Sequence, residues 1–225
     1  MSGAEHSRLI FALDLSSLEQ AESWVVRLSP DVSHFKVGLE LFSAAGPEVI
    51  RMITRRSEAG VFLDLKLHDI PTQVGRAVRA IRELGVRMLT VHAQGGEAML
   101  RAAASEAGPD VCVLAVTRLT SEEAGVEEVV ELAKLAQAAS CGGVVCSGDE
   151  AAYVRKAVGA NFRIVCPGIR AQGSSRGDQV RTVTAFEAIR AGADYIVVGR
   201  PIRDAEDPLQ AARAISDEIT RALGS

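Results

Sequence analysis

Short apolar segments alternate with longer amphipathic segments along the whole of this chain. The short segments are expected to be strands, at residues 9–13, 34–37, 61–66, 88–92, 111–116, 143–146, 163–166 and 195–198. The longer segments show helical spacing of apolar residues, at residues 18–28, 47–57, 71–84, 96–106, 121–139, 149–158, 182–191 and 208–223. Strands that are apolar almost throughout are typical of a parallel sheet with helices on both faces.

Eight strand–helix units in 225 residues predict an α/β fold, the (β/α)8 TIM barrel. The alternative is an open Rossmann-like sheet, but no G-x-G-x-x-G motif follows the first strand. Hydrophobic residues make up 48% of the chain, enough for one core, and no linker marks a second domain. We therefore expect a single domain over residues 1–225, with residues 1–7 as a flexible extension.

The charge and the cysteines argue against several classes of protein. A net charge of −4 gives no basic surface for nucleic acid or for an anionic membrane. No apolar run is long enough to cross a bilayer, and residues 1–7 have no apolar signal-peptide core. The four cysteines form no C-x-x-C pair, so neither a metal site nor a disulfide framework is expected. These features predict a cytoplasmic protein without a nucleic-acid or membrane partner.

Two charges of opposite sign interrupt the third expected strand. Asp64 and Lys66 are two residues apart, so on a regular strand their side chains point to the same face. Asp69 follows just past the strand, and Pro71 stands where a helix would begin. Because unpaired charges in a buried strand are costly, this cluster indicates a chemical role. The alternative is a structural ion pair at the end of a strand.

Other polar residues also fall at the carboxyl ends of expected strands. Asp14 ends the first strand and Lys36 the second, and a barrel carries its active site at this edge. Because the first three strands are neighbours, we expect Asp14, Lys36, Asp64 and Lys66 to form one network of alternating charge. Flanking carboxylates favour protonated lysines, which suits a proton donor rather than an imine-forming nucleophile.

The last two units suggest a phosphate site. Barrels often bind phosphate at the loops after strands 7 and 8, through backbone N–H groups and a helix N-terminus. Residues 168–181 are rich in glycine and serine, and Gly199 and Arg200 follow the eighth strand. A lone Gly-Arg pair is typical of a surface turn, but its position after strand 8 favours phosphate binding.

Taken together, these residues resemble the orotidine 5′-monophosphate decarboxylase family, bacterial type, over essentially the whole chain. The motifs that carry the resemblance are Phe-Ala-Leu-Asp14, Phe-Lys36-Val-Gly, Asp64-Leu-Lys66-Leu-His-Asp69-Ile-Pro, Val-His92-Ala, Leu-Thr120-Ser, Pro-Gly-Ile-Arg170, Gly-Asp-Gln179 and Val-Gly199-Arg200-Pro-Ile. The resemblance implies a cofactor-free enzyme that converts orotidine 5′-monophosphate to uridine 5′-monophosphate in de novo pyrimidine biosynthesis. It also implies a homodimer in which Asp69 reaches the site of the partner.

The resemblance assigns roles residue by residue. Lys66 would donate a proton to C6 of the pyrimidine, between the carboxylates of Asp64 and Asp69. Asp14 and Lys36 would hold the ribose hydroxyls. The other substrate contacts that the resemblance implies are Ile70, Thr72, Gln73, Thr120, Arg170, Gln179, Gly199 and Arg200, of which the last two would bind the phosphate.

One departure from the family pattern concerns the ribose contact across the dimer. The family has a threonine at the second position after Ile-Pro, where this chain has Gln73, preceded by Thr72. Either the Gln73 amide or the Thr72 hydroxyl takes over that contact.

Two other functions compete with this interpretation. A Mg²⁺-dependent sugar-phosphate decarboxylase or aldolase on a related barrel would depend on the metal and have no use for Arg170 or Gln179. A non-catalytic phosphate-binding protein would have little reason to keep Asp64, Lys66 and Asp69.

Overall fold

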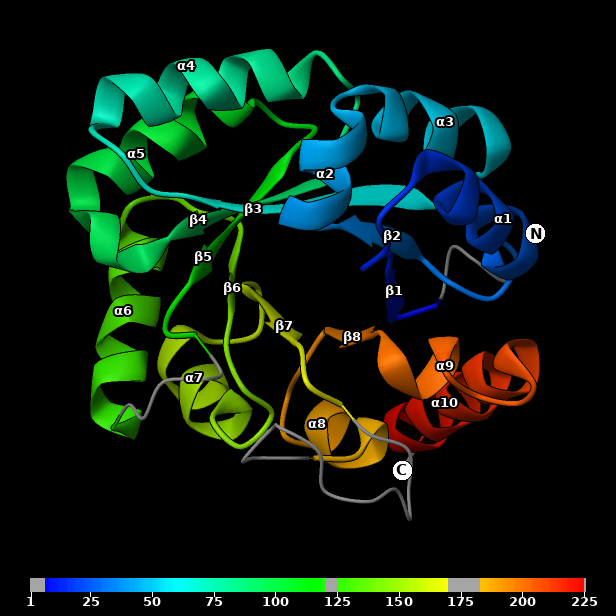
Figure 1. The fold of residues 1–225 in the computed structure, drawn as a ribbon. Coiled ribbons are helices and arrows are strands. Elements are labelled where there is room, and N and C mark those ends of the chain that lie inside the picture. The colour runs from blue at the N-terminus through cyan, green and yellow to red at the C-terminus, as the bar shows by residue number, and fades with distance from the viewer. Residues whose placement is uncertain (1–6, 120–124, 170–182, 225) are drawn as a thin grey trace.

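Eight parallel strands form a closed barrel in chain order, and the last strand pairs with the first (Figure 1). The computed structural model describes residues 7–119, 125–169 and 183–224. The strands are β1 (Leu9–Ala12), β2 (His34–Val37), β3 (Gly60–Leu67), β4 (Met88–His92), β5 (Cys112–Val116), β6 (Gly143–Val145), β7 (Arg163–Cys166) and β8 (Tyr195–Val198). The predicted (β/α)8 class is confirmed.

Helices surround the barrel on its outside (Figure 1). They are α1 (Leu18–Leu28), α2 (Leu39–Ala45), α3 (Glu48–Arg56), α4 (Pro71–Arg82), α5 (Gly96–Ala107), α6 (Val126–Ala138), α7 (Ala151–Val158), α8 (Ala185–Arg190), α9 (Arg200–Arg203) and α10 (Pro208–Leu223), with a 3-10 turn, η2 (Ala93–Gly95). None of the helices in the described ranges is long and apolar enough to cross a bilayer.

The sequence prediction lacks α2 and α9. They have 7 and 4 residues, too few to show a helical period over several turns. Both begin directly after a strand, with Gly38 and Gly199 as their N-cap residues. They therefore lie over the carboxyl ends of β2 and β8, at the edge of the barrel where the polar residues gather.

Side-chain caps fix the starts of three helices. Ser17 accepts a hydrogen bond from the backbone N–H of Gln20 at the start of α1. Thr184 and Glu187 form a reciprocal capping box at α8, and Asp207 caps α10. Such caps satisfy N–H groups that have no partner inside the helix.

Alternate residues of the strands point into the barrel and towards the helices. Leu9 and Phe11 of β1 belong to the large core between sheet and helices. The inside of the barrel is filled by a smaller cluster: Ile10, Ala12, Phe62, Met88, Leu114, Val165 and Val197. This apolar plug leaves room for polar chemistry only at the two ends of the barrel.

Strand β3 is irregular where it carries the charges. It pairs with β4 through Leu63 and Leu89, and then through Leu67 and Val91. Residues 64–66 of β3 therefore lie opposite Thr90 alone, a bulge at which the regular ladder is interrupted. Lys66 has a φ of +50°, in the left-handed region that residues other than glycine rarely adopt.

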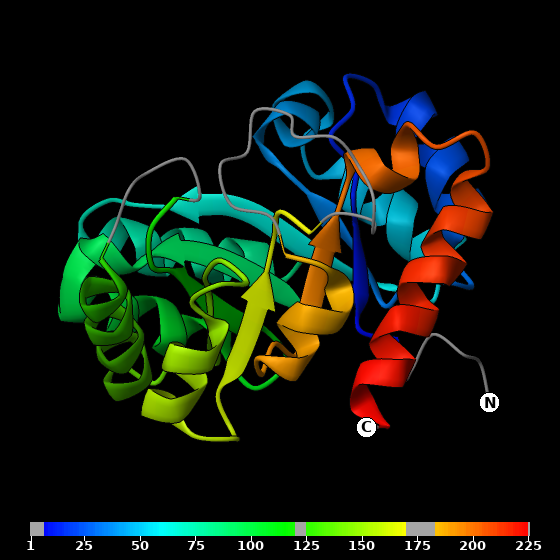
Figure 2. The same cartoon turned by 90° about the horizontal axis from the view of Figure 1, so that it is seen from below.

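The strands run towards one face of the molecule. Figure 2 shows β7 and β8 pointing to the same side, whereas the end of α10 lies at the opposite side. At that opposite side Ser7 donates a hydrogen bond to the carbonyl of Asp31. The rest of the expected flexible extension, residues 1–6, lies outside the described residues.

Candidate active site

Four charged side chains alternate in sign at the carboxyl ends of β1, β2 and β3. Lys36 Nζ lies 2.9 Å from Asp14 Oδ1 and 3.7 Å from Asp64 Oδ2. Lys66 Nζ donates a hydrogen bond to the same Asp64 oxygen at 2.8 Å. The structure thus brings together the four residues that the sequence pattern grouped, in the order Asp14, Lys36, Asp64, Lys66.

The register of β1, β2 and β3 explains why Asp14, Lys36 and Asp64 lie close together. Ala12 pairs with Lys36, and Lys36 pairs with Phe62. Asp14 and Asp64 each follow two residues after the paired residue of their own strand, which places them one layer nearer the carboxyl edge on the same side as Lys36. Gly38 completes the arrangement, because a Cβ there would come within 3.2 Å of Lys36 Nζ.

Asp64 lies at the centre of the network. Its side chain is 13% exposed, whereas that of Asp14 is 54% exposed. Burial raises the pKa of Asp64, but the charges of Lys36 and Lys66 and the hydrogen bonds from Lys66 and Thr90 lower it further, so the pKa lies below its ordinary value. Asp64 is therefore a carboxylate at neutral pH.

Thr90 connects the backbone and the charges of β3. The backbone N–H of Lys66 donates to Thr90 Oγ1 at 2.9 Å. Thr90 Oγ1 in turn donates to Asp64 Oδ1 at 2.9 Å. The two Asp64 oxygens are thereby divided between Thr90 on one side and the lysines on the other.

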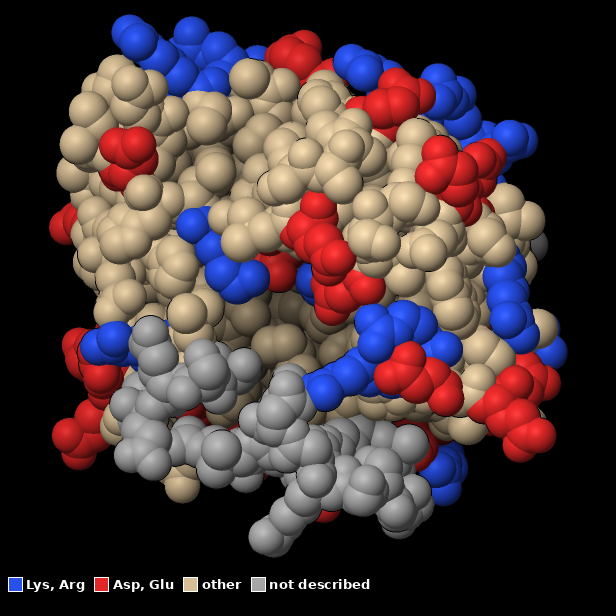
Figure 3. Space-filling view, in the orientation of Figure 1, with Lys and Arg blue, Asp and Glu red and all other residues tan. Residues whose placement is uncertain are grey.

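A cavity of about 200 Å³ opens beside Lys36, Asp64 and Lys66. The other residues that line it are Phe62, Val116, Arg118, Leu119, Val145, Pro167 and Val197. Figure 3 shows the face seen in Figure 1 hollowed at its centre, with basic and acidic side chains at the edge of the hollow. Apolar walls beside a charged edge suit a flat ring that carries polar substituents.

Sequence reasoning did not single out Arg118, although it lines this cavity. Its Nε donates to Glu128 Oε1 of α6 at 3.0 Å. An arginine two residues after a strand is common on protein surfaces, and its contact with the site depends on the path of the chain after β5. Its position beyond a strand carboxyl end was the one available signal.

Gly199 and Arg200 stand beside the network. A Cβ at Gly199 would lie 3.4 Å from Ala12 Cβ and 3.7 Å from Asp14 Oδ2, so this turn passes close to β1. Arg200 is exposed and opens α9. Arg203, one turn later, donates from Nη1 to the carbonyl of Asp14 at 3.2 Å, which fixes α9 against the end of β1.

Asp69 and the residues after it are exposed at the rim. Asp69 Oδ1 accepts a hydrogen bond from the N–H of Ile70 at 2.6 Å. Within the described part of the chain Asp69 forms no ion pair with Lys66. Thr72 and Gln73 lie in the first turn of α4 and are exposed as well. A single chain therefore does not bring these residues to the network.

Three of the predicted substrate contacts, Thr120, Arg170 and Gln179, lie outside the described residues.

No three His, Cys, Asp or Glu side chains gather in a way that suits a metal ion, as far as the described residues extend. The nearest carboxylates, Asp14 and Asp64, each contact a lysine ammonium.

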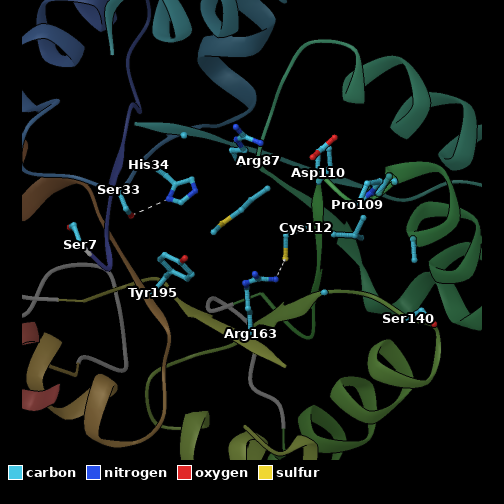
Figure 4. Close-up of a pocket in the computed structure, with 18 of the residues that line it drawn as sticks. Ser7, Ser33, His34, Arg87, Pro109, Asp110, Cys112, Ser140, Arg163 and Tyr195 are labelled. Atoms are coloured by element: carbon cyan, nitrogen blue, oxygen red, sulfur yellow. Dashed lines mark hydrogen bonds between the residues drawn. The ribbon is translucent and has the colours of Figure 1, made fainter. Parts of the chain in front are cut away.

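A second and larger cavity, of about 620 Å³, lies at the other end of the barrel (Figure 4). His34, Arg87, Cys112, Arg163 and Tyr195 are among its lining residues. Burial and the charges of the two arginines lower the pKa of His34 to about 4, so this ring is neutral at pH 7. The cavity has none of the alternating carboxylates and lysines found at the carboxyl face.

Comparison with known proteins shows the family to which this chain belongs. The model of the orotidine 5′-phosphate decarboxylase / HUMPS family matches residues 7–215. The chain is 50% identical over 220 residues to orotidine 5′-phosphate decarboxylase of Anaeromyxobacter dehalogenans, over 93% of this chain and 96% of the relative. It is also 50% identical over 232 residues to that of Moorella thermoacetica, over 94% and 92% of the two chains.

Solved structures agree with these relatives. The crystal structure of orotidine 5′-phosphate decarboxylase from Lactobacillus acidophilus matches with a TM-score of 0.82 and 36% identity. The match covers 95% of this chain and 99% of that chain. The match to the family model and the identity to these relatives show that the chain belongs to the orotidine 5′-phosphate decarboxylase / HUMPS family and is a carboxy-lyase.

Proposed function

We propose that this protein removes the carboxylate of orotidine 5′-monophosphate without a cofactor, and that Lys66 supplies the proton that replaces it. One observation carries the proposal: the Lys66 ammonium is held by Asp64 at the edge of an apolar-walled cavity. The product is uridine 5′-monophosphate, an end product of pyrimidine biosynthesis.

The chemistry requires a proton donor near C6. When the bond between C6 and the carboxyl carbon breaks, its electron pair stays on C6 and CO2 leaves. The Lys66 ammonium stabilises this negative charge and transfers a proton to C6, and the resulting amine regains a proton from solvent. Lys66 is 29% exposed, so it can reach both a bound ring and water.

The carboxylate of Asp64 serves this step by its position. It accepts a hydrogen bond from Lys66 Nζ at 2.8 Å and so holds Nζ at the edge of the cavity. Lys36 shares the same carboxylate and also contacts Asp14. We assign Asp14 and Lys36 to the ribose hydroxyls, because Lys36 lines the cavity and contacts the half-exposed Asp14, and the two side chains can donate to and accept from a hydroxyl.

We assign the phosphate to the Gly199 amide and Arg200. The turn passes close to β1 without a side chain in the way, and a guanidinium opens α9. Three roles implied by the sequence resemblance remain predictions: Gln179 bridging phosphate and base, Arg170 in the loop that closes over the site, and Thr120 near the base.

We further propose that two chains form a homodimer in which Asp69 of the partner subunit completes each site. Ile70 is 62% and Leu39 59% exposed, an unusual exposure for large apolar residues at the rim of a site. Asp69, Thr72 and Gln73 lie in the same exposed segment. A partner that covers this rim would bury the apolar side chains and bring a second carboxylate towards Lys66.

The test follows the ultraviolet absorbance of orotidine 5′-monophosphate with purified protein, with and without a chelator. We expect rapid loss of substrate that the chelator does not change. Lys66→Ala should abolish turnover but still bind uridine 5′-monophosphate, whereas Lys134→Ala, at an exposed lysine of α6, should behave as wild type. Turnover by Lys66→Ala near the wild-type rate would refute its role as proton donor. If orotidine 5′-monophosphate is not consumed at all, a sugar-phosphate enzyme is favoured, and consumption that the chelator stops would contradict a cofactor-free reaction.

The phosphate assignment has its own test. Arg200→Ala should lower kcat/KM by about 30-fold or more, as expected for losing about 2–5 kcal/mol from a charged contact. Arg101→Ala, at an exposed arginine of α5, is the matched control. An unchanged kcat/KM for Arg200→Ala would place the phosphate elsewhere.

A further inference from the structure

We infer that Thr90 is a positioning residue for the proposed reaction: its hydroxyl holds the Lys66 backbone and the Asp64 carboxylate in the arrangement that aims the ammonium. This inference rests on the proposed function of Lys66. Thr90 itself does not line the cavity and is not a catalytic residue.

The bulge in β3 creates the need for such a residue. Residues 64–66 lie opposite Thr90 alone, so the regular backbone pairing of β3 with β4 is interrupted there. Lys66 is also held at a φ of +50°. A strained conformation persists only where its surroundings hold it. The Lys66 N–H donates a hydrogen bond to Thr90 Oγ1 at 2.9 Å, which holds Lys66 in this conformation. It also gives the Lys66 N–H a partner at the bulge, where regular backbone pairing with β4 is interrupted.

The Thr90 hydroxyl acts both as a hydrogen-bond acceptor and as a hydrogen-bond donor towards β3. It accepts from the Lys66 N–H and donates to Asp64 Oδ1, each at 2.9 Å. Asp64 Oδ1 is thereby engaged, and Oδ2 is the oxygen that Lys36 and Lys66 contact. One side chain on β4 therefore fixes the carboxylate plane and the backbone of the proton donor together.

Burial makes this contact hard to replace. Thr90 is 0% exposed, and it points into the barrel together with Met88. If the hydroxyl were removed, the Lys66 N–H and Asp64 Oδ1 would each lose a hydrogen-bond partner. A valine fills nearly the same space but offers no hydrogen bond, so it isolates the role of the hydroxyl from that of packing.

The kinetic test compares Thr90→Val with Thr90→Ser. Thr90→Val should lower kcat by about 10- to 100-fold, because a small misplacement of the reacting group is costly, while KM changes less than about threefold. Thr90→Ser keeps the hydroxyl and should stay within about threefold of wild type. Thr117→Val is the matched control: Thr117 is 0% exposed, and its hydroxyl donates to the carbonyl of Val145 and to neither Asp64 nor the Lys66 backbone.

A second readout needs no substrate. Lys36 from β2, Lys66 from β3 and Thr90 from β4 face Asp64, and Asp14 faces it through Lys36. Because the Thr90 hydrogen bond helps to lower the pKa of Asp64, Thr90→Val should raise it. A carbon-13 NMR titration of labelled aspartate should show this rise, and the Lys66 amide should exchange faster with solvent.

The outcomes separate this inference from the proposed function. A loss of kcat in Thr90→Val, recovery in Thr90→Ser and a raised pKa of Asp64 would support Thr90 as a positioning residue. Kinetics and titration equal to those of Thr117→Val would overturn it. If the wild type does not turn over orotidine 5′-monophosphate, the proposed function fails. The titration and amide exchange then decide whether Thr90 holds Asp64 and Lys66, and an unchanged titration overturns the inference in that case too.

Discussion

A single carboxylate organises the residues of this site. Asp64 contacts two lysines and one threonine that come from three different strands. Each contact lowers the energy of the charged form, and together they outweigh the cost of burial. The same contacts that aim Lys66 therefore also make the site depend on the ionisation of Asp64.

The stability of the protein should reveal this ionisation. The pKa of Asp64 is lower in the folded chain than its ordinary value of 3.8. The unfolded chain thus takes up the proton first as the pH falls, so the stabilisation is complete above about pH 4 and is lost as the pH falls through the lower, folded pKa. Urea unfolding of Asp64→Asn should show a shallower loss of stability below pH 4 than wild type. Asp110→Asn, at an exposed aspartate, serves as control, and parallel curves for wild type and Asp64→Asn would contradict the assignment.

Single residues differed in how readily the sequence revealed them. Asp14, Lys36, Asp64 and Lys66 could be grouped because charges at strand ends are unusual in apolar segments. Thr90 could not, since threonine is common in strands and its role depends on which residues of β3 lie opposite it.

The elements of the barrel fit one another closely, and β6 shows this best. A Cβ at Gly143 would lie 2.4 Å from the backbone carbonyl oxygen of Arg163 and 2.8 Å from Leu114 Cδ2. Neighbouring strands on both sides thus leave room only for a hydrogen atom. Glycine at this position allows β5, β6 and β7 to pair at their observed register.

Gly143→Ala should therefore destabilise the protein. Because the clash involves backbone on β7, relief requires a shift of a whole strand, and we expect a loss of about 1–3 kcal/mol in the free energy of unfolding. Gly125→Ala, where a Cβ meets nothing within 4 Å, should change it by less than about 1 kcal/mol. Chemical denaturation measures both, and equal stability of the two variants would contradict the expectation.

The positions of the strands could be predicted from the sequence, whereas the bulge in β3 and the short helices could not. Apolar runs marked every strand within one or two residues, since a strand buried on both faces must be apolar throughout. The bulge in β3 was not foreseen, because it depends on the pairing with β4 rather than on local sequence. The short helices α2 and α9 were missed for want of a repeating pattern, although they lie over the strand ends that carry the site.

At the scale of the whole molecule, the proposed exchange of Asp69 between subunits can be tested by mixing variants. Lys66→Ala and Asp69→Ala should each be nearly inactive alone. A mixed dimer would hold one site with both substitutions and one site with neither. After random exchange, half of the dimers are mixed, so about a quarter of wild-type activity should return.

The activity of the mixed samples distinguishes a site shared by two subunits from a site built within one chain. Recovery near a quarter would support a site built from two subunits, and Ile70→Asp, at the exposed rim, should prevent it by opposing association. No recovery, in samples shown by mass spectrometry to contain mixed dimers, would mean that Asp69 acts within its own chain or not at all.

The pairing of β1 with β8 has a consequence for synthesis on the ribosome. Leu9 and Tyr195 belong to strands that meet only when the barrel closes. During translation, β1 therefore keeps an unpaired edge until nearly the whole barrel has emerged, and exposed strand edges invite association with other chains. A nascent chain of this protein has to be shielded from its neighbours until its last strand is available.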